Sequence, residues 1–305
     1  MPTALVTGGA GFIGSTLTRL LLEQGHDVRI YDDLSSGAEG NLDGIDLELV
    51  VGDVRDLESL TAAASGCDML FHLAAGAGVV QSIEEPLVNF DQNARGTVSA
   101  LEAARLAGVP RVVFSSSNAP LGAGAYPASE EKPVAPLSPY GASKAVGEAY
   151  CSAYHGAYGM DAVAVRFSNA YGPRSAHKGN VIPVFIRRIL AGEELVVYGD
   201  GTQTRDFVYV SDLARGLLRA AQAPDAGGEI FQLASGVETS LNELVSLLGE
   251  VSGRELRVRR EPPRAGEIER NYSLIAKARE RLGHEPEVSL AEGVRRTWDW
   301  FAPGE

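Results

Sequence analysis

The N-terminal stretch TALVTGGAGFIG, residues 3–14, leads from an apolar strand through a glycine-rich turn into a helix. Thr3–Thr7 is a short apolar run typical of a buried strand, and Phe12–Glu23 has the apolar spacing of a helix. The turn contains Gly8, Gly11 and Gly14. Glycines at this spacing let backbone N–H groups approach a pyrophosphate, whose charge the helix N-terminus favours. The flanking strand and helix therefore predict a dinucleotide-binding unit, which a glycine-rich turn alone would not.

Acidic residues after the next two predicted strands bear on the choice of dinucleotide. The strand Asp27–Tyr31 is followed by Asp32 and Asp33. An acid at this place can accept hydrogen bonds from an adenosine ribose, and Asp32 would repel a 2′-phosphate, so we expect NAD rather than NADP. After the third strand, Asp53 and Val54 lie where an adenine edge would be met. A helix cap is the alternative role for Asp53.

Strands and helices alternate through the first half of the chain. Further strands are predicted at Leu47–Val51, Met69–Leu73, Arg111–Ser115 and Ala162–Arg166, and long helices at Asn93–Leu106 and Tyr140–Tyr158. Strict alternation implies right-handed crossovers and a parallel sheet covered on both faces. The predicted fold class is therefore α/β, a doubly wound parallel sheet, and His72 is expected to pack as a strand residue.

The pattern loosens after residue 168. Residues 169–204 are rich in Gly, Pro and Asn and include an apolar helix at Ile182–Leu190. Two more strands are predicted at Asp206–Val210 and Glu229–Leu233, followed by helices at Leu241–Val251 and up to Trp300. We expect a nucleotide-binding domain of residues 1–168 plus 206–233. Residues 169–205 and 234–305 would form a smaller substrate-binding lobe across a cleft.

Composition excludes several classes of protein. In 305 residues, 45% are hydrophobic and 22% charged, a mixture typical of a folded globular protein. The 27 Lys and Arg against 40 Asp and Glu give a net charge of −13, which opposes binding to nucleic acid or to an anionic membrane. Cys67 and Cys151 are far apart, and the five histidines lack metal-ligand spacing, so no disulfide and no metal site is expected. Without a leader or a membrane-length apolar run, the expected location is cytoplasmic.

A phenol and an ammonium lie four residues apart at the start of a predicted helix. Tyr140 and Lys144 therefore point to the same face. A cation at ~4 Å, at an effective dielectric near 20, contributes about 4 kcal/mol, roughly three pK units, which would make Tyr140 a usable base. Such a pair is also common between plain surface neighbours. Three serines, Ser115–Ser117, end the fifth strand and would face the same site, but chemistry alone does not choose among them.

Together these motifs resemble those of the extended short-chain dehydrogenase/reductase family, in its NAD-dependent nucleotide-sugar epimerase and dehydratase branch, which has a Rossmann fold. The resemblance covers almost the whole chain. It rests on Thr7–Gly14, Asp32, His72–Ala75, Ser115–Gly122, Tyr140–Lys144, Arg166–Arg174, Gln203–Phe207 and Pro262–Glu267. It implies that Ser117 is the catalytic serine, Tyr140 the base and Lys144 the orienting cation.

The resemblance also implies which residues contact the ligands. Those for NAD are Gly8, Gly11, Phe12, Ile13, Gly14, Asp32, Asp33, Asp53, Val54, Leu73, Ala74, Ala75, Asn93, Ser115, Tyr140, Lys144 and Phe167. Those for a UDP-sugar are Ser117, Asn118, Tyr140, Asn169, Asn180, Val181, Tyr198, Arg205, Arg264 and Glu267. Within the second set the two arginines match clamps for the diphosphate, the tyrosine an aromatic on the uracil, and the glutamate a ligand of the ribose hydroxyls. Surface ion pairs or core packing are the alternative roles.

The residues after the catalytic serine distinguish the reactions of this branch. Dehydratases of the family carry Asp-Glu there, and uronate decarboxylases a Glu at the second position, whereas this chain has Asn118 and Ala119. No ionisable group is then available for proton removal at C5 or for acid assistance at C6. The expected reaction is 4-epimerisation of a UDP-hexose through a transient 4-keto sugar. Asn271, at a position whose bulk in known epimerases governs acceptance of N-acetyl sugars, suggests that a 2-acetamido group would fit.

Three further expectations remain open at this point. Pro120–Leu121 replaces the usual Val-Tyr beside the sugar, so a UDP-glucuronate 4-epimerase or another nucleotide-sugar epimerase or dehydratase is an alternative. A non-catalytic NAD-binding sensor is a second alternative, against which the joint presence of Ser117, Tyr140 and Lys144 argues. By the resemblance, helices 93–106 and 140–158 would form a homodimer interface.

Overall fold

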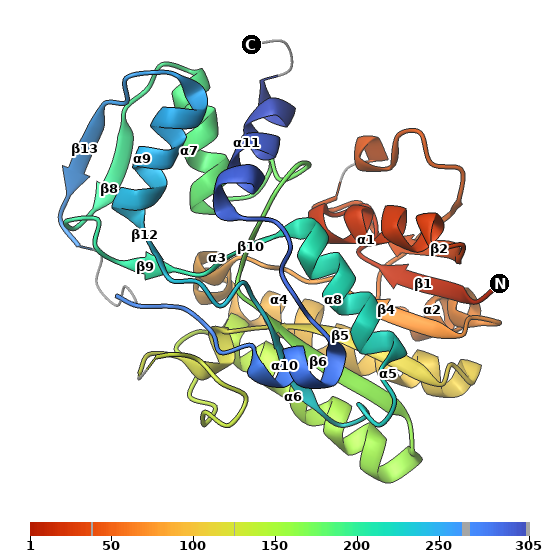
Figure 1. The fold of residues 1–305 in the computed structure, drawn as a ribbon. Helices are drawn as coiled ribbons and strands as arrows, with labels where there is room; N and C mark the ends of the chain where they lie inside the picture. Colours follow the sequence, from red (N-terminus) through yellow and green to blue (C-terminus); the bar gives the residue numbers. More distant parts are fainter. Residues whose placement is uncertain (38, 125, 264–268, 303–305) are drawn as a thin grey trace.

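A seven-stranded parallel sheet forms the centre of the molecule, shown in Figure 1 as a ribbon. The computed structural model describes residues 1–37, 39–124, 126–263 and 269–302. The strands of the sheet are β1 (Thr3–Thr7), β2 (Asp27–Asp32), β3 (Glu48–Val51), β4 (Met69–His72), β5 (Arg111–Ser117), β6 (Asp161–Phe167) and β11 (Ile230–Leu233). Their order is β11-β6-β5-β4-β1-β2-β3 and every pairing is parallel. The predicted doubly wound α/β fold is thereby confirmed.

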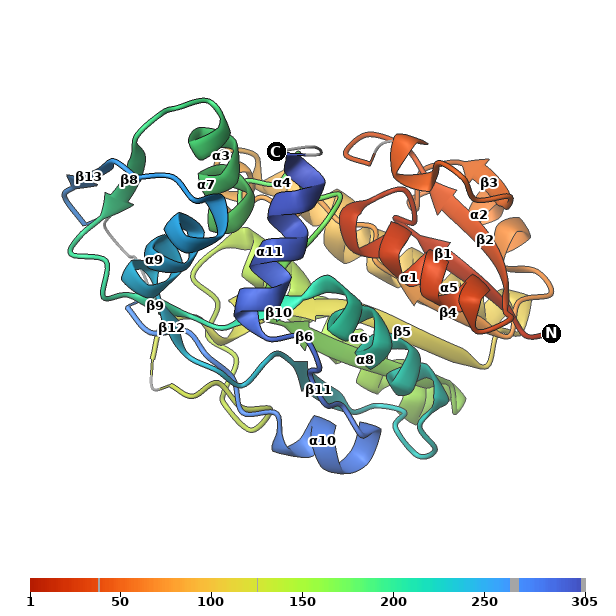
Figure 2. The same cartoon turned by 45° about the horizontal axis from the view of Figure 1, so that its top comes forward.

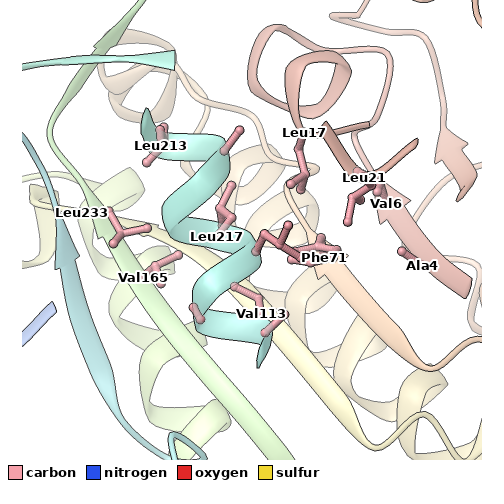
Figure 3. Packing of buried hydrophobic residues seen from close by; sticks show 14 of the residues in the cluster. Ala4, Val6, Leu17, Leu21, Phe71, Val113, Val165, Leu213, Leu217 and Leu233 are labelled. Carbon is pink, nitrogen blue, oxygen red and sulfur yellow. The ribbon is translucent and has the colours of Figure 1, made fainter. Parts of the chain in front are cut away.

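Helices cover both faces of this sheet because successive strand residues point to opposite sides. On one face lie α1 (Phe12–Glu23) and α8 (Val210–Gln222). Figure 3 shows Leu213 and Leu217 of α8 packed with residues of the strands. On the other face lie α2 (Leu57–Ala64), α5 (Gly96–Ala107) and α6 (Pro139–Tyr158).

Some elements differ from those predicted. The strand expected at Asp206–Val210 is shorter, β10 (Phe207–Tyr209), and pairs with β7 (Asn169–Tyr171) outside the main sheet. Helix α8, which directly follows it, is not among the predicted helices. The helix expected from Asn93 begins earlier, as a π-helical turn η2 (Phe90–Arg95) that continues into α5. The unpredicted elements also include helix α2 and the short elements η1 (Glu39–Leu42), α3 (Val79–Glu84), α4 (Pro86–Asn89) and η3 (Ala119–Leu121).

A third apolar cluster lies away from the main sheet. It is built mainly from α7 (Val181–Leu190), β8 (Leu195–Tyr198), α9 (Leu241–Ser252) and α11 (Leu290–Phe301). Strand β8 pairs with β13 (Val258–Glu261), and β9 (Thr204–Arg205) pairs with β12 (Thr239–Ser240). Helix α10 (Ala276–Leu282) instead packs with the main sheet. In Figures 1 and 2, α7, α9 and the β8–β13 pair lie at one end of the molecule and β1–β3 at the other. Phe207 and Tyr209 also join the third cluster, so the proposed domain boundaries remain a prediction.

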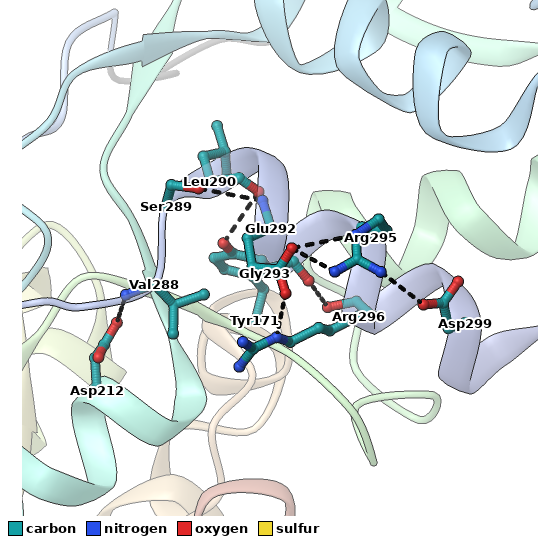
Figure 4. Close-up of polar contacts among 11 residues, drawn as sticks. Tyr171, Asp212, Val288, Ser289, Leu290, Glu292, Gly293, Arg295, Arg296 and Asp299 are labelled. Carbon is teal, nitrogen blue, oxygen red and sulfur yellow. Dashed lines mark hydrogen bonds and ion pairs between the residues drawn. The ribbon is translucent and has the colours of Figure 1, made fainter.

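The last helix, α11, and the segment before it are attached to α8 and β7 by hydrogen bonds. The buried carboxylate of Asp212 accepts hydrogen bonds from the N–H groups of Glu287 and Val288, at 3.0 and 3.1 Å. Tyr171 donates to the carbonyl of Leu290 at 3.5 Å, as Figure 4 shows. Among the residues that the structure describes, no helix is long and apolar enough to cross a membrane.

Candidate functional site

The glycine-rich turn lies at the carboxyl end of β1, where the order of the sheet reverses between β1 and β4. Gly11 is the N-cap residue of α1, and because it has no side chain it does not hydrogen-bond to the N–H groups of the first turn. A Cβ at Gly14 would collide with the carbonyl oxygen of Gly8. A Cβ at Gly8 would lie 2.7 Å from the nitrogen of Ala74, at a φ of +72°. The turn is thus a close-packed backbone cradle at a helix N-terminus, which fits the diphosphate of NAD.

Asp32 joins the end of β2 to this cradle. Its side chain is buried, and its two oxygens accept the N–H groups of Ala10 at 2.9 Å and of Leu34 at 2.8 Å. Burial raises the pKa of Asp32, and the two N–H donors oppose that shift. Asp33 is exposed and bonds to Ser35. Of the two acids, Asp32 is therefore the one built into the cradle.

Asp53 and Val54 lie just after β3. The guanidinium of Arg55 binds the Asp53 carboxylate and holds its pKa below the usual value. The helix cap weighed for Asp53 belongs instead to Asp56, which accepts the N–H of Ser59 at 3.1 Å and caps α2. That alternative for Asp53 is wrong.

The loop after β4, with Leu73, Ala74 and Ala75, is tied to two helices by Asn93. Asn93 accepts the N–H of Gly76 at 2.8 Å and donates to its carbonyl at 3.0 Å. The same amide donates to Ser143 of α6 at 3.2 Å, so the loop and α6 are fixed to each other. His72, at the end of β4, lies between the hydroxyls of Thr7 and Thr97, and burial lowers its pKa to about 3. It packs as a neutral strand residue, as expected.

The three predicted catalytic residues come together where β5 ends and α6 begins. Ser138 caps α6 by accepting the N–H of Gly141 at 3.1 Å, which sets the helix to start one residue before Tyr140. Lys144 is 3% exposed. Its Nζ donates to the carbonyl of Ser115 at 2.7 Å and lies 5.9 Å from the centroid of the Tyr140 ring. The phenol of Tyr140 is hydrogen-bonded to the side chain of Ser117.

The electrostatics of this group differ from the sequence-based expectation. Burial raises the pKa of Tyr140, although the hydrogen bond with Ser117 opposes this. Burial also lowers the pKa of Lys144 to about 7, with the Glu148 carboxylate acting in the opposite direction. The prediction that Lys144 lowers the phenol pKa by roughly three units is therefore wrong for the protein without bound NAD. The reason is that burial disfavours both charged forms and the ammonium donates to a carbonyl.

Residues predicted to bind the sugar nucleotide lie on β7, β8 and β9 and at the start of α7. Asn169 donates from its backbone and its side chain to the carbonyl of Asp206, at 3.0 and 3.2 Å. Asn180 is exposed at the start of α7, directly before Val181, and Arg205 lies in β9. Tyr198 ends β8. Phe167, which is predicted to contact NAD, ends β6. Arg264 and Glu267 lie outside the described residues.

Asn118 takes the place at which dehydratases of the family carry an acid. It is buried after β5, and its Nδ2 donates to the hydroxyl of Ser273 at 2.9 Å. Its Oδ1 is buried and has no hydrogen-bond partner in the part of the chain that the structure describes. The neighbouring residue Ala119 opens the η3 turn. Neither side chain can exchange a proton as a carboxylic acid would.

Asp206 belongs to the motif Gln203–Phe207, but its role was not predicted from the sequence. Its carboxylate is fully buried and accepts hydrogen bonds from Ser235, Gly236 and the N–H of Ser273. It thus holds the loop after β11 and the segment near residue 273 against β9. The signal in the sequence was a charged residue between Arg205 and a run of apolar strand residues. No group of three potential metal ligands occurs among the described residues.

Comparisons with known proteins agree with this geometry. The model of the NAD dependent epimerase/dehydratase family matches residues 4–234. A UDP-glucose 4-epimerase of Mycolicibacterium smegmatis is 41% identical over 307 residues, covering 97% of each chain. A UDP-N-acetylglucosamine 4-epimerase of Methanobrevibacter ruminantium, solved with UDP-N-acetylmuramic acid, has a TM-score of 0.93 at 34% identity and 98% coverage of each chain. A UDP-glucose 4-epimerase of Thermus thermophilus, solved with NAD, has a TM-score of 0.91 at 34% identity, covering 99% of this chain and all of the other.

Proposed function

This chain belongs to the NAD dependent epimerase/dehydratase family, and on that basis we propose that it is an NAD-dependent UDP-sugar 4-epimerase. The observation that carries the proposal is the meeting of Tyr140, Lys144 and Ser117 beside the uncharged Asn118 and Ala119. Tyr140, Lys144 and Ser117 can transfer a proton to and from a sugar hydroxyl. Asn118 and Ala119 provide neither the acid nor the base that a dehydratase would need.

The cradle and the strand ends around it would hold NAD. The backbone between Gly8 and Gly14 would take the diphosphate, and Asp32 the adenosine ribose. Asp53 and Val54 would border the adenine, while the loop after β4, Asn93, Ser115 and Phe167 would border the nicotinamide side. When bound, NAD supplies a reversible hydride acceptor and a positive charge near the Tyr140 phenol.

The proton steps belong to this chain. In the ionised state, the phenol oxygen of Tyr140 takes the proton of the sugar 4-hydroxyl, with the Ser117 hydroxyl bonded to both. Lys144, held by the Ser115 carbonyl, stabilises the phenolate. Residues 118 and 119 carry no carboxylate that could remove a proton from C5. The 4-keto sugar therefore turns in the site and regains its hydrogen at C4 on the opposite face. The reaction is redox-neutral overall.

The second lobe would hold the UDP moiety. Arg205 and Arg264 would clamp the diphosphate, since guanidinium groups pair with phosphate oxygens in a forked geometry. Asn169, Asn180 and Val181 would border the sugar diphosphate, Tyr198 the uracil, and Glu267 the ribose. The two arginines would give this acidic protein the local positive charge that an anionic substrate needs.

The test is conversion of UDP-sugars by the purified protein without added reductant. We expect UDP-galactose to become UDP-glucose. We also expect UDP-N-acetylgalactosamine to be converted, as the family resemblance implies for a medium-sized residue such as Asn271. UDP-glucuronate is the comparison substrate for the alternative. A 4-keto-6-deoxy product, or release of NADH in proportion to turnover, would contradict the proposal.

We also propose that the protein is a homodimer and that it works in the cytoplasm. Apolar side chains are exposed on α3, α4 and η2, which pack against α6, and Leu87 is 81% exposed. This surface begins earlier in the chain than the helices 93–106 and 140–158 suggested for the interface.

The proposed cytoplasmic location is supported by the cysteines. Both are free thiols, in keeping with a reducing compartment.

The proposed interface predicts the effect of a charge introduced into the exposed apolar surface on α3, α4 and η2. Leu87→Arg should convert a dimer of about twice 32.2 kDa into monomers, because an arginine cannot be buried there without a partner. Sedimentation equilibrium measures the mass, and Val237→Arg, at an exposed apolar residue after β11, is the matched control. A wild-type protein that sediments as a monomer would contradict the proposal.

A further inference from the structure

A buried ion pair lies one helical turn beyond Lys144. Glu148 and Arg166 are 4% and 1% exposed. The guanidinium donates two hydrogen bonds to the carboxylate, from Nε to Oε1 at 2.7 Å and from Nη2 to Oε2 at 2.8 Å. Because Tyr140, Lys144 and Glu148 follow each other at intervals of four residues, they share one face of α6.

The pair is connected to the catalytic end of β5. Oε1 of Glu148 also accepts the hydroxyl of Ser116 at 2.6 Å. Ser116 lies between Ser115, whose carbonyl holds Lys144, and Ser117, whose side chain bonds to Tyr140. Ser116 is also the register partner of Arg166 on the neighbouring strand. One carboxylate thus fixes the strand segment from which both catalytic contacts of α6 are made.

The charges of this group nearly compensate each other. Arg166 pairs with Glu148 through a two-bond contact, so the charge of the carboxylate is balanced mainly by the guanidinium and not by the ammonium of Lys144. The other titratable groups around the pair are neutral or engaged. His72 on β4 has a pKa of about 3, and burial raises the pKa of the Cys151 thiol on α6. Glu130 accepts the N–H of Gln232, the register partner of Arg166 on β11.

We propose that Glu148 and Arg166 are positioning residues, whose paired charges hold the β5 serines in place and leave Lys144 free to act on Tyr140. The inference rests on the proposed epimerase function. Without Arg166, the Glu148 carboxylate would cancel part of the charge of Lys144. Without Glu148, the buried guanidinium of Arg166 would lose its ion-pair partner, and the negative charge that acts on Lys144 would be gone.

The two single charge removals should therefore move the pH dependence of kcat in opposite directions. Glu148→Gln makes the site more positive, which lowers the pKa of both Tyr140 and Lys144, so the pH optimum should fall by about one unit. Arg166→Gln makes the site more negative, so the optimum should rise by a similar amount. The double variant E148Q/R166Q should return the optimum toward that of the wild type.

A control variant distinguishes an effect of charge on the pH optimum from an effect on the fold. Glu292→Gln removes an arginine-bound carboxylate on the surface of α11 and should leave the optimum unmoved. If both single variants lower kcat without shifting the optimum, or shift it in the same direction, the pair serves the fold alone and the inference is wrong. A single variant that does not fold is replaced by Glu148→Asp or Arg166→Lys, which keep the charge and should keep the optimum near that of the wild type.

A second readout does not depend on turnover. Protein labelled with 13Cζ-tyrosine and loaded with NAD reports the titration of Tyr140 by NMR, and Tyr140→Phe assigns the resonance. We expect the midpoint to fall in E148Q and rise in R166Q. If these shifts occur in a protein that converts no UDP-sugar, the positioning role stands and the proposed function fails. If the wild type turns over and the midpoint does not move, the inference fails instead.

Discussion

Tyr140→Phe should lower kcat for UDP-sugar interconversion by roughly 10³- to 10⁴-fold while leaving the fold intact. The substitution removes the phenol oxygen that is hydrogen-bonded to the Ser117 side chain. It keeps the ring in place, and the hydrogen bond from Lys144 to the Ser115 carbonyl does not involve the lost oxygen. Steady-state kinetics with UDP-galactose measure the loss, and thermal unfolding checks the fold.

NAD affinity distinguishes this outcome from general damage. The variant should bind NAD about as well as the wild type, because the cradle around Gly8 and Gly14 is untouched. Tyr150→Phe is the matched control, since Tyr150 is an exposed tyrosine on the same helix and should keep full activity. A Tyr140→Phe variant that retains a tenth or more of the wild-type kcat would overturn the assignment of Tyr140 as the base. A protein that only senses NAD would be indifferent to the change.

Gly14→Ala should weaken NAD binding by about a hundredfold, equal to about 2.7 kcal/mol. The added Cβ would collide with the carbonyl oxygen of Gly8, a backbone atom that can move only if the whole turn shifts. Such a shift displaces the N–H groups of the α1 N-terminus from the place of the diphosphate. Titration calorimetry with NAD measures the affinity.

The same substitution at an open position provides the control. A Cβ at Gly156, in the exposed part of α6, would meet nothing within 4 Å, so Gly156→Ala should bind NAD normally. It should also stabilise the helix by about 0.5–1 kcal/mol, because glycine loses more backbone entropy on folding than alanine. Wild-type NAD affinity in Gly14→Ala would show that the turn is not the diphosphate cradle.

Much of the fold followed from short-range patterns. The run Thr3–Thr7, the glycines after it and the helix Phe12–Glu23 are present in the structure with the predicted bounds. Helix α8 was not predicted, although its buried residues Leu213 and Leu217 recur at helical spacing. The sequence predicts one strand over Asp206–Val210, whereas the structure has the shorter β10 and begins α8 at Val210. Short apolar runs do not by themselves distinguish a strand of the main sheet from a small separate pair.

Some features of the candidate site also follow from local sequence, whereas others depend on contacts between distant parts of the chain. The spacing of Tyr140 and Lys144 already places them on one helix face, because 3.6 residues complete a turn. Which of three serines meets them was open from the residues alone and came from the family resemblance. The pairing of Asp206 with the segments near 235 and 273 joins parts of the chain far apart in sequence. No local pattern encodes such a contact.

The sequence alone thus established the strand–turn–helix cradle, the acid after β2 and the tyrosine–lysine pair, since each depends on residues within one or two turns of each other. Tertiary structure decided that Glu148, Arg166 and Ser116 form one buried network, because it draws on α6, β6 and β5. It also reversed the direction expected for the Tyr140 pKa. Burial depends on how the whole chain packs, and in a dry environment desolvation outweighs the attraction of a neighbouring charge.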